Sequence, residues 1–394
     1  MRRIPVLLVV LVLFSSPSWA SNKVQAFTVA QLGQWLTSMH GQPDGKIAKE
    51  LESTIVTERV SVAQLGQWLP DLPGRHSRDA LTALADLSIF LPPPPGDVLA
   101  DPPPDIKTQG AIFSHAIDYV VQTLGKLPDL SGTRTTVHFE DTPSTSGSQQ
   151  LSQTASAAER SSPFGYSVSP ATIAGVTYHQ GSAAKPLHST GDSTVPVSYS
   201  NGVEMHGVEK MDRTAINNPE SGLNTAGEFG PILSLVLDDA YHGTLDWGYW
   251  QQSPLGKLAV FRYKVEEGQS DYVVALKHGI RQERLFPAYH GEIAIDPVTG
   301  AVLRISLLGS ALRSQYIMES AITVDYGSVA LGGKNYICPI KGIALLRTTP
   351  DSSAATGLHT QINDAAFTDY HLTPGDATTA PAPPAPPPPA PTQR

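Results

Sequence analysis

The side chains best suited to acid–base chemistry gather between residues 238 and 246. Asp238 and His242 are four residues apart, so a helix would place a carboxylate beside an imidazole, with Asp239 and Asp246 close in sequence. Such a set could serve general acid–base catalysis or supply metal ligands. A histidine in the last turn of a helix also interacts favourably with the helix dipole, and we favour that structural interpretation.

Two smaller groups could do related chemistry. His290 and Glu292 lie two residues apart on a predicted strand and share one face, but two ligands are too few for a metal site. Ser193 ends a Gly191-Asp192-Ser193 turn similar to those that carry a serine nucleophile, with His188 just before it. A turn leading into a strand explains the same residues, so neither group is assigned a catalytic role.

Motif searches assign no catalytic residue, no metal site and no cofactor. The sequence lacks His-Glu-x-x-His, a phosphate-binding Walker loop, Gly-x-Ser-x-Gly and a Cys-x-x-Cys pair. We therefore favour a protein that is not an enzyme. A hydrolase that uses His242 with a nearby aspartate, or Ser193 with His188, is the alternative.

Aromatic residues form the best candidate for a binding site. The candidate ligand-binding residues come from two neighbouring predicted strands and are Trp247, Tyr249, Trp250, Phe261 and Tyr263. These side chains could line a concave apolar pocket for an acyl chain or a peptide. Core packing of a small sheet needs the same residue types, so a plain hydrophobic core is the competing interpretation.

Composition indicates a folded, acidic protein. Of 394 residues, 40% are hydrophobic and 16% charged, which is enough apolar material for one or two cores. The formal net charge of −9 disfavours nucleic-acid partners, because these require a basic surface. The single cysteine, Cys338, lies among apolar strand-forming residues and has no second cysteine to pair with, so we expect a buried thiol.

The first 20 residues have the layout of a secretory signal peptide. Arg2 and Arg3 precede an apolar run over residues 4–14, and Ser18-Trp19-Ala20 matches a small-x-small cleavage site. The apolar run is too short for a comfortable membrane span. We therefore expect an exported protein, periplasmic or extracellular, that starts near Ser21 and keeps no transmembrane anchor.

A tandem repeat opens the mature chain. Residues 29–36 return unchanged as residues 62–69, and each copy follows a helix-capping hydroxyl, Thr28 or Ser61. Helical apolar spacing, a turn and a second amphipathic stretch in each copy predict two helix-turn-helix units within residues 21–91. Two copies are too few for a solenoid, so we expect a small helical bundle. Each copy holds one tryptophan that either fills the core or anchors a partner, namely Trp35 and Trp68.

Proline-rich and polar stretches divide the rest of the chain. Residues 92–105 hold two proline runs and should form a stiff linker. A helix is predicted over 106–124 and a strand over 133–139. The Ser/Thr-rich stretch 141–163 has too few apolar residues to fold and is predicted to be a disordered insertion. The tail, residues 374–394, is rich in Ala and Pro and should be extended and disordered.

Residues 106–373 are predicted to form an α+β domain based on an antiparallel sheet. Asn201-Gly202 indicates a hairpin, and the apolar periodicity of 229–241 indicates a helix that covers one face of the sheet. The expected fold class is therefore α+β, with an N-terminal helical bundle followed by a curved antiparallel sheet. The predicted strands cover residues 195–199, 203–208, 244–250, 258–265, 272–276, 291–295, 302–307, 321–326 and 336–346.

Several motifs resemble those of a family of exported bacterial proteins whose role is not established. They are Phe229-Gly230-Pro231, residues 258–263, residues 289–300 and Tyr336-Ile337-Cys338-Pro339. The resemblance extends over most of the mature chain and implies export.

A more distant resemblance concerns the turn Asp296-Pro297-Val298-Thr299-Gly300 and the following Arg304. This turn in an antiparallel meander is similar to that of LolA-like half-barrels, which hold acyl chains or lipoproteins in the periplasm. The resemblance implies a curved half-barrel with an apolar ligand such as a lipid. We accordingly expect an exported, non-enzymatic protein that binds an apolar ligand or a protein partner in the cell envelope.

Overall fold

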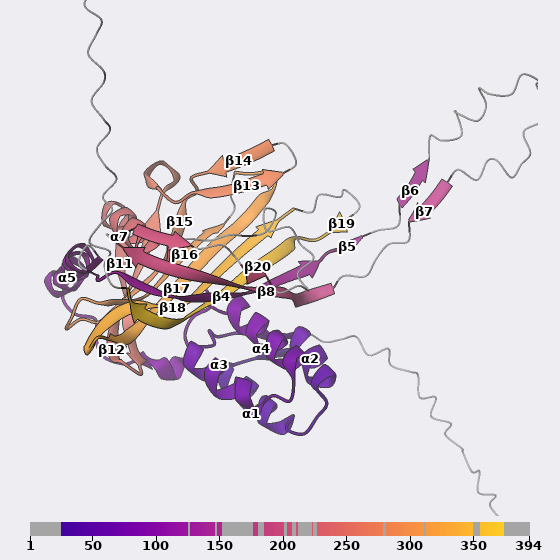
Figure 1. Cartoon of the computed structure of the whole chain (residues 1–394), viewed down its shortest axis with the longest axis horizontal. Helices are drawn as coiled ribbons and strands as arrows, with labels where there is room; N and C mark the ends of the chain where they lie inside the picture. The colour runs from indigo at the N-terminus through magenta and orange to yellow at the C-terminus, as the bar shows by residue number, and fades with distance from the viewer. Residues whose placement is uncertain are drawn as a thin grey trace, which may run out of the picture.

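The structure is a computed structural model of the 394-residue chain (Figure 1). The expected signal peptide, the expected tail and most of the expected insertion at 141–163 lie outside the described residues. The structure describes residues 25–124, 127–145, 148–151, 176–179, 185–200, 203–206, 210–211, 223, 227–278, 281–310, 313–349 and 355–373.

The helical region, residues 25–91, contains both copies of the repeat. Its two repeat helices begin with complete capping boxes. The hydroxyls of Thr28 and Ser61 accept the backbone N–H of Gln31 and Gln64, whose side chains accept the N–H of the cap residue in return. The predicted caps are confirmed. The elements are β1 (Gln25–Phe27), α1 (Val29–Ser38), α2 (Asp44–Glu52), β2 (Thr54–Val56), α3 (Val62–Trp68), η1 (Leu69–Asp71) and α4 (Arg75–Leu87).

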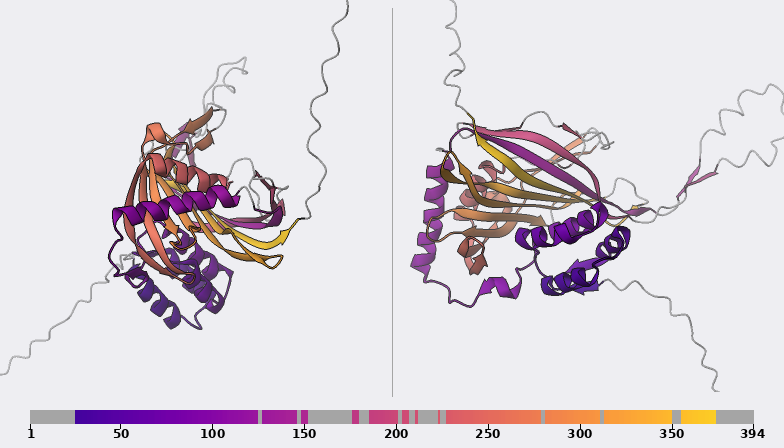
Figure 2. Two further views of the ribbon diagram at one scale, coloured as in Figure 1. Left: turned by 90° about the vertical axis from the view of Figure 1, so that its left-hand side faces the viewer. Right: turned by 60° about the horizontal axis from the view of Figure 1, so that its bottom comes forward.

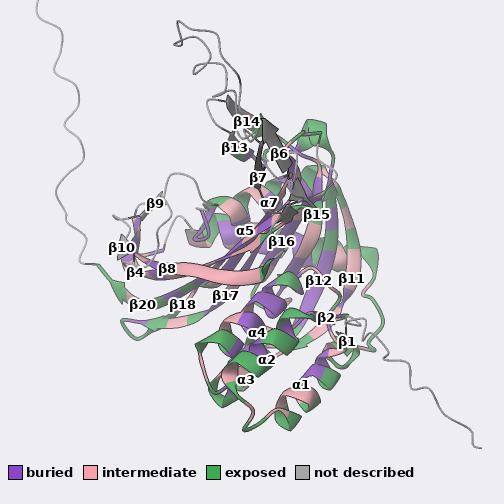
Figure 3. Ribbon diagram, turned by 90° about the vertical axis from the view of Figure 1, so that its right-hand side faces the viewer, coloured by how far each residue is buried: buried purple, intermediate pink, exposed green. Residues whose placement is uncertain are grey.

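Both tryptophans of the repeat are half-buried in the packing of this region. The helices of the region carry both buried and exposed stretches (Figure 3). The ring of Trp68 packs over Gly33 so closely that an added Cβ there would lie 3.1 Å from it. Trp35 instead packs against Phe27, with ring centroids 6.1 Å apart. The tryptophan of the second copy therefore contacts the first copy, whereas the tryptophan of the first copy contacts the residues just before its own helix. The fully buried side chains between them include Leu32, Ile47, Leu51 and Leu81.

The rest of the chain is built on a 12-stranded sheet in which every neighbouring pair is antiparallel. Its order is β10-β8-β4-β20-β18-β17-β16-β15-β12-β11-β3, with β9 paired to β8, and the two ends are not joined. The predicted α+β class is confirmed. The strands are β3 (Val98–Leu99), β4 (Leu130–Thr142), β8 (Lys185–Ser200), β9 (Val203–His206), β10 (Lys210–Met211), β11 (Thr244–Ser253), β12 (Gly256–Val265), β15 (Tyr289–Ile295), β16 (Val302–Ser310), β17 (Ile317–Leu331), β18 (Lys334–Thr348) and β20 (His359–Leu372).

Four short strand pairs of the described residues lie outside this sheet, and one of them is the parallel pair β1–β2 of the helical region. β13 (Val274–His278) pairs with β14 (Arg281–Leu285). Within the interval predicted to be an insertion, β5 (Ser144–Thr145) pairs with β19 (Ala355–Thr356), and β6 (Ser148–Leu151) pairs with β7 (Val176–His179). The start of that interval therefore takes part in pairing.

The sheet curves around two helices, α5 (Ile106–Leu124) and α7 (Pro231–His242), which lie on its concave face (Figure 2). The predicted helix at 229–241 covers this face, and the helix predicted at 106–124 shares the role. A sheet of this width presents more apolar surface than one helix can cover. At Gly300 the turn between β15 and β16 comes so close to α5 that a Cβ would lie 2.6 Å from the carbonyl oxygen of His115.

The helical region docks on the opposite, convex face of the sheet (Figure 1). Ala83 of α4 and Ile89 pack there against apolar side chains of four strands, β4, β17, β18 and β20. The helical region and the sheet are thus held together by a shared core. The strand residues of this core are Phe139, Ala321, Ile343, Leu345 and Ile362.

The proline-rich residues 92–105 run along the edge of the sheet and form what we call the strap (Figure 2). They include the short helix η2 (Pro95–Asp97) and β3, which pairs with β11. The indole N–H of Trp250 donates to the carbonyl of Pro102 at 3.1 Å, and the Lys257 amine forms an ion pair with Asp101. The strap therefore carries the chain from the convex face to the concave face around the β11 edge.

Cys338 is buried, with 1% of its surface exposed, as predicted. Burial raises the pKa of its thiol to about 11, which suits a structural rather than a reactive cysteine. Among the helices that the structure describes, none combines the length and the apolar character needed to cross a membrane.

Candidate functional site

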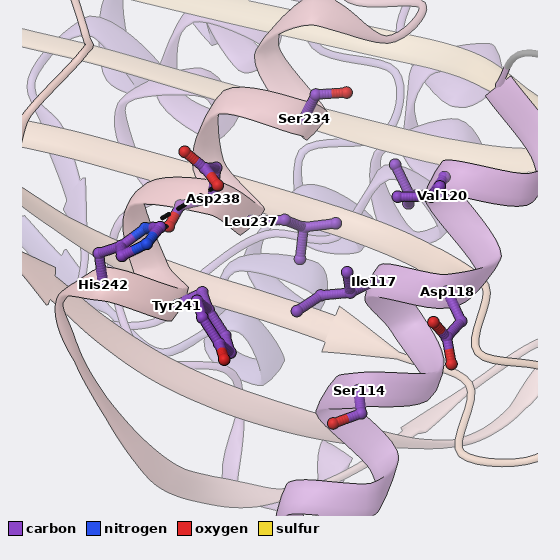
Figure 4. Close-up of a pocket in the computed structure, with 10 residues that line it drawn as sticks. Ser114, Ile117, Asp118, Val120, Ser234, Leu237, Asp238, Tyr241 and His242 are labelled. Carbon is purple, nitrogen blue, oxygen red and sulfur yellow. Dashed lines mark hydrogen bonds and ion pairs between the residues drawn. The ribbon is translucent and has the colours of Figure 1, made fainter.

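A groove of about 710 Å³ opens between α5 and α7 above the concave face (Figure 4). Its volume lies within the range of ordinary small-molecule sites. Each helix contributes residues three or four positions apart, which is the spacing that lines up along one helical face. The lining residues are Ser114, Ile117, Asp118, Val120 and Val121 from α5 and Ser234, Leu237, Asp238, Tyr241 and His242 from α7.

The floor of the groove is apolar and partly open to solvent. Ile117, Val120 and Leu237 face the space between the helices (Figure 4). Two further apolar side chains are unusually accessible, since Val121 is 72% exposed and Tyr241 66% exposed. Large exposed apolar groups around a concave surface are typical of a binding site.

Polar side chains form the rim of the groove. Ser114 and Asp118 lie on the α5 side, and Ser234 and Asp238 lie on the α7 side. His242 keeps its Nδ1 atom 2.9 Å from the carbonyl oxygen of Asp238, so the imidazole caps the end of α7 as the helix-dipole interpretation predicts. None of the ten described lining residues is a lysine or an arginine.

The structure keeps only part of the predicted cluster at 238–246 together. His242 Nδ1 lies 3.8 Å from an Asp238 carboxylate oxygen, as the four-residue spacing predicts, whereas Asp239 and Asp246 point elsewhere. Asp239 turns into the core, where it accepts hydrogen bonds from the Tyr289 hydroxyl at 2.6 Å and from the Asp271 backbone N–H at 3.1 Å. Asp246 precedes Trp247 on β11 and so lies on the other face of the sheet. Carboxylate oxygens of Asp238, Asp239 and Asp271 lie within 4.8 Å of one another, but two of these residues are exposed, and we assign no metal.

The predicted aromatic set is divided between the two faces. Phe261 and Tyr263 are 2% and 3% exposed and lie under α5 and α7. Trp247 packs edge-on to Phe261 at 5.4 Å, and Phe113 of α5 packs on the same ring at 5.9 Å. These three predicted residues fill the core beneath the groove, and none of the five lines the groove itself.

The other two members of the aromatic set have separate contacts. A register shift between Trp247 and Tyr249 turns Tyr249 to the convex face. Its hydroxyl donates to Glu292 at 2.8 Å and receives a contact from Arg59 at 3.4 Å, and burial raises its pKa to about 12. The indole N–H of Trp250 is used in its hydrogen bond to Pro102 of the strap.

Glu292 joins the helical region to the convex face. Its carboxylate lies 3.3 Å from Arg59, whose side chain is only 5% exposed, and 3.4 Å from Arg262. His290 and Glu292 alternate with inward-facing Gly291 and Ile293, which confirms that they share a face. Glu292 acts in docking rather than in ligation, because it is already bound by two arginines and by the Tyr249 hydroxyl.

A second charged cluster is buried between α4 and the sheet. The amine of Lys341 lies 3.1 Å from Asp364 and 3.5 Å from Asp86, whose side chain is 1% exposed. Burial and the nearby Asp364 raise the pKa of Asp86 well above 3.8, while Lys341 opposes them. The Lys341 amine thus lies between two carboxyl groups, one on α4 and one on β20, and links the helical region to the sheet. Nearby, burial lowers the pKa of Arg304 to about 10.

Ser193 has a histidine partner, but it is not His188. His138 Nε2 lies 3.1 Å from the Ser193 hydroxyl, and His138 Nδ1 lies 2.8 Å from the Asn363 amide oxygen. His188 instead contacts the carbonyl of Pro186 at 2.9 Å. Three adjacent strands, β8, β4 and β20, thus align a hydroxyl, an imidazole and an amide in the order found in hydrolase triads.

This arrangement is buried. Ser193 is 2% and Asn363 is 5% exposed, and the Asn363 side-chain N–H₂ donates to the carbonyl of Leu223 at 2.5 Å. Neither residue lines the groove. Sequence reasoning missed Asn363 because it placed no strand at 359–372, although the alternation of Ala365 with Phe367 could have indicated one. It missed His138, which lies on the predicted strand 133–139, because the sequence did not show which strands would become its neighbours.

Comparison with known proteins adds no relative from which a function could be carried over. No family model, curated protein or solved structure matches the chain. The site is therefore interpreted from its own geometry.

Proposed function

We propose that the protein binds an apolar ligand in the groove between α5 and α7. The observation that carries the proposal is an open, apolar groove of about 710 Å³ at which Val121 and Tyr241 remain exposed. Covering one such side chain with a ligand is worth about 1–2 kcal/mol. A rim of serine and aspartate side chains would orient the polar end of the ligand.

The groove lies above the aromatic residues that the sequence indicated as the lining of a pocket. Trp247, Phe261 and Tyr263 support the groove from below, because α5 and α7 rest on them. Similarity of the turn at 296–300 to LolA-like half-barrels favours a lipid or another acyl-chain compound. The N-terminal 20 residues favour a place in the cell envelope.

Native mass spectrometry with organic extraction tests the proposal on protein exported to the periplasm of an expression host. We expect a co-purified apolar molecule in stoichiometric amount. Val121→Asp puts a charge into the groove and should abolish its retention. Val298→Asp is the matched control, because Val298 is 81% exposed on the β15–β16 turn and lies outside the groove. Empty wild-type protein that also fails to take up added acyl compounds would overturn the proposal.

A hydrolase is the second candidate function, favoured by the Ser193–His138–Asn363 hydrogen bonds. In this function His138 Nε2 would accept the proton of the Ser193 hydroxyl as that oxygen attacks a carbonyl. Burial of Ser193 places this function second. Labelling with a fluorophosphonate probe decides the matter: reaction lost in Ser193→Ala but kept in Ser320→Ala, another buried serine, would support it, and absence of labelling in the wild type would exclude a reactive serine.

A further inference from the structure

Apart from His242, whose Nδ1 lies 3.8 Å from an Asp238 carboxylate oxygen, the charged side chains among the described lining residues of the α5–α7 groove are carboxylates. Asp118 on one wall and Asp238 on the other are exposed carboxylates, and the ten lining residues include no lysine or arginine. Oxygens of Asp239 and Asp271 lie within 4.8 Å of Asp238, which adds negative charge at that end. α7 also ends there, at His242, so the partial negative charge of its C-terminus acts in the same direction.

An aromatic ring stands at the same end of the groove. Tyr241 is 66% exposed, and His242 packs against its ring edge-on, with centroids 5.3 Å apart. An exposed aromatic face beside carboxylates is the combination that binds ammonium groups, because the ring quadrupole attracts a cation. Three groups that attract a cation therefore lie within one turn of α7: the Asp238 carboxylate, the C-terminal end of the helix and the face of the Tyr241 ring.

We propose that the ligand of this groove is a small amphiphile with a cationic head, an amine or a quaternary ammonium group on an apolar chain. The inference rests on the proposed function, since the chain would occupy the same apolar floor formed by Ile117, Val120 and Leu237. The head lies between Asp238 and Tyr241. A fatty acid is disfavoured, because its carboxylate would meet Asp118 and Asp238, and the described lining residues include no lysine or arginine to pair with it.

The size of the groove selects a small molecule over a peptide. About 710 Å³ suits a ligand of lipid or drug size, whereas an amphipathic peptide helix needs a long groove with several successive pockets. The two walls are single stretches of α5 and α7 that span residues 114–121 and 234–242. A single chain with one head group matches that length.

Three probes with the same chain test the charge preference: dodecyltrimethylammonium, dodecanol and dodecyl sulfate. Binding is measured by isothermal titration calorimetry below the micelle concentrations. We expect the ammonium compound to bind about 10-fold or more tightly than the sulfate, with dodecanol between them. Only the ammonium affinity should fall as salt is raised.

Removing the rim charges sharpens the test. The double variant Asp118→Asn/Asp238→Asn should weaken ammonium binding by about 3- to 10-fold and leave dodecanol binding unchanged, because two exposed ion pairs are each worth a modest factor. Asp246→Asn is the matched control, since it removes the same charge from the opposite face of the sheet. It should change neither affinity.

The outcomes separate this inference from the proposed function. If dodecyl sulfate binds as tightly as the ammonium compound or more tightly, the cationic head is overturned. The apolar groove would still stand if Val121→Asp abolishes dodecanol binding. Failure of all three probes to bind would overturn both. Binding of a basic amphipathic peptide with no binding of dodecyltrimethylammonium would overturn the small amphiphile.

Discussion

The two faces of the sheet are covered in opposite ways. On the concave face, α5 and α7 rest on aromatic and aliphatic side chains such as Phe261, which is 2% exposed. On the convex face, the helical region rests partly on apolar residues and partly on charges that are almost fully enclosed. Arg59 reaches Glu292, and Asp86 reaches Lys341. The concave face is held mainly by apolar packing, to which the Asp239–Tyr289 hydrogen bond of α7 adds, and the convex face is held also by ion pairs.

This difference teaches where each kind of force is useful. Apolar packing is favourable in many orientations, so helices that rest on it can shift or separate to admit a ligand. Buried charges cost desolvation and are satisfied only when each partner is in place, which fixes one position of the helical region on the sheet. The groove accordingly lies between the elements held by apolar packing.

The largest expected effect comes from the concave face. Phe261→Ala should lower the free energy of unfolding by about 4 kcal/mol, because it removes packing with Phe113 and Trp247 and leaves a cavity. Urea unfolding followed by tryptophan fluorescence measures this. Phe286→Ala is the matched control, since Phe286 is 46% exposed and should cost less than about 1 kcal/mol. Equal losses in the two variants would break the comparison.

Removing one charge from the convex face should cost slightly less. Lys341→Met leaves Asp364 without its cation in a buried site, and we expect a loss of about 3 kcal/mol in the free energy of unfolding. Replacing the whole cluster, as Asp86→Leu/Lys341→Met/Asp364→Leu, should restore stability to within about 1 kcal/mol of wild type. A triple variant as unstable as the single one would show that the charges themselves stabilise the docking.

Arg59→Met should have a smaller effect, about 2 kcal/mol, because Glu292 keeps the Tyr249 hydroxyl at 2.8 Å and Arg262 at 3.4 Å. The loss should appear as faster hydrogen exchange in α4 than in α7. Arg313→Met controls for the loss of an arginine, since the Arg313 side chain is 86% exposed and pairs with Glu267 at the surface, away from the helical region. Equal exchange in α4 for the two variants would argue against docking through Arg59.

The smallest effect is a pH dependence. The pKa of Asp86 is raised by burial, so the native state holds this proton more tightly than the unfolded chain does. The resulting stability is complete below about pH 4 and is lost as pH rises. Asp86→Asn, which stays neutral, should therefore gain stability relative to wild type as the pH rises above about 4. Parallel stability curves for the two proteins would contradict this.

Local features of the fold could be predicted from the sequence. The capping hydroxyls Thr28 and Ser61, the helix at 106–124 and the alternation along β12 follow from neighbouring residues and are confirmed. The strand at 359–372 was missed, because its polar residues interrupt the apolar alternation that marked the other strands.

The candidate site was less predictable, since it depends on distant parts of the chain. Its walls come from helices more than 100 residues apart, and sequence periodicity does not say which helices become neighbours. A one-residue register shift places Tyr249 on the convex face, and the residue types around it do not predict that shift. His138 and Asn363 meet across 225 positions, which strand pairing alone determines.

The strap also bears on how separate copies of the protein behave toward one another. β11 is the last long strand on its side of the sheet, and an unpaired outer strand is a template for joining sheets edge to edge. β3 pairs with β11 at Trp250 and Gln251, so this part of the edge is covered. The prolines that follow β3 lack the N–H groups needed to pair with a further strand. The linker between two parts of the chain is therefore also a guard against self-association, placed where an open sheet is most exposed to it.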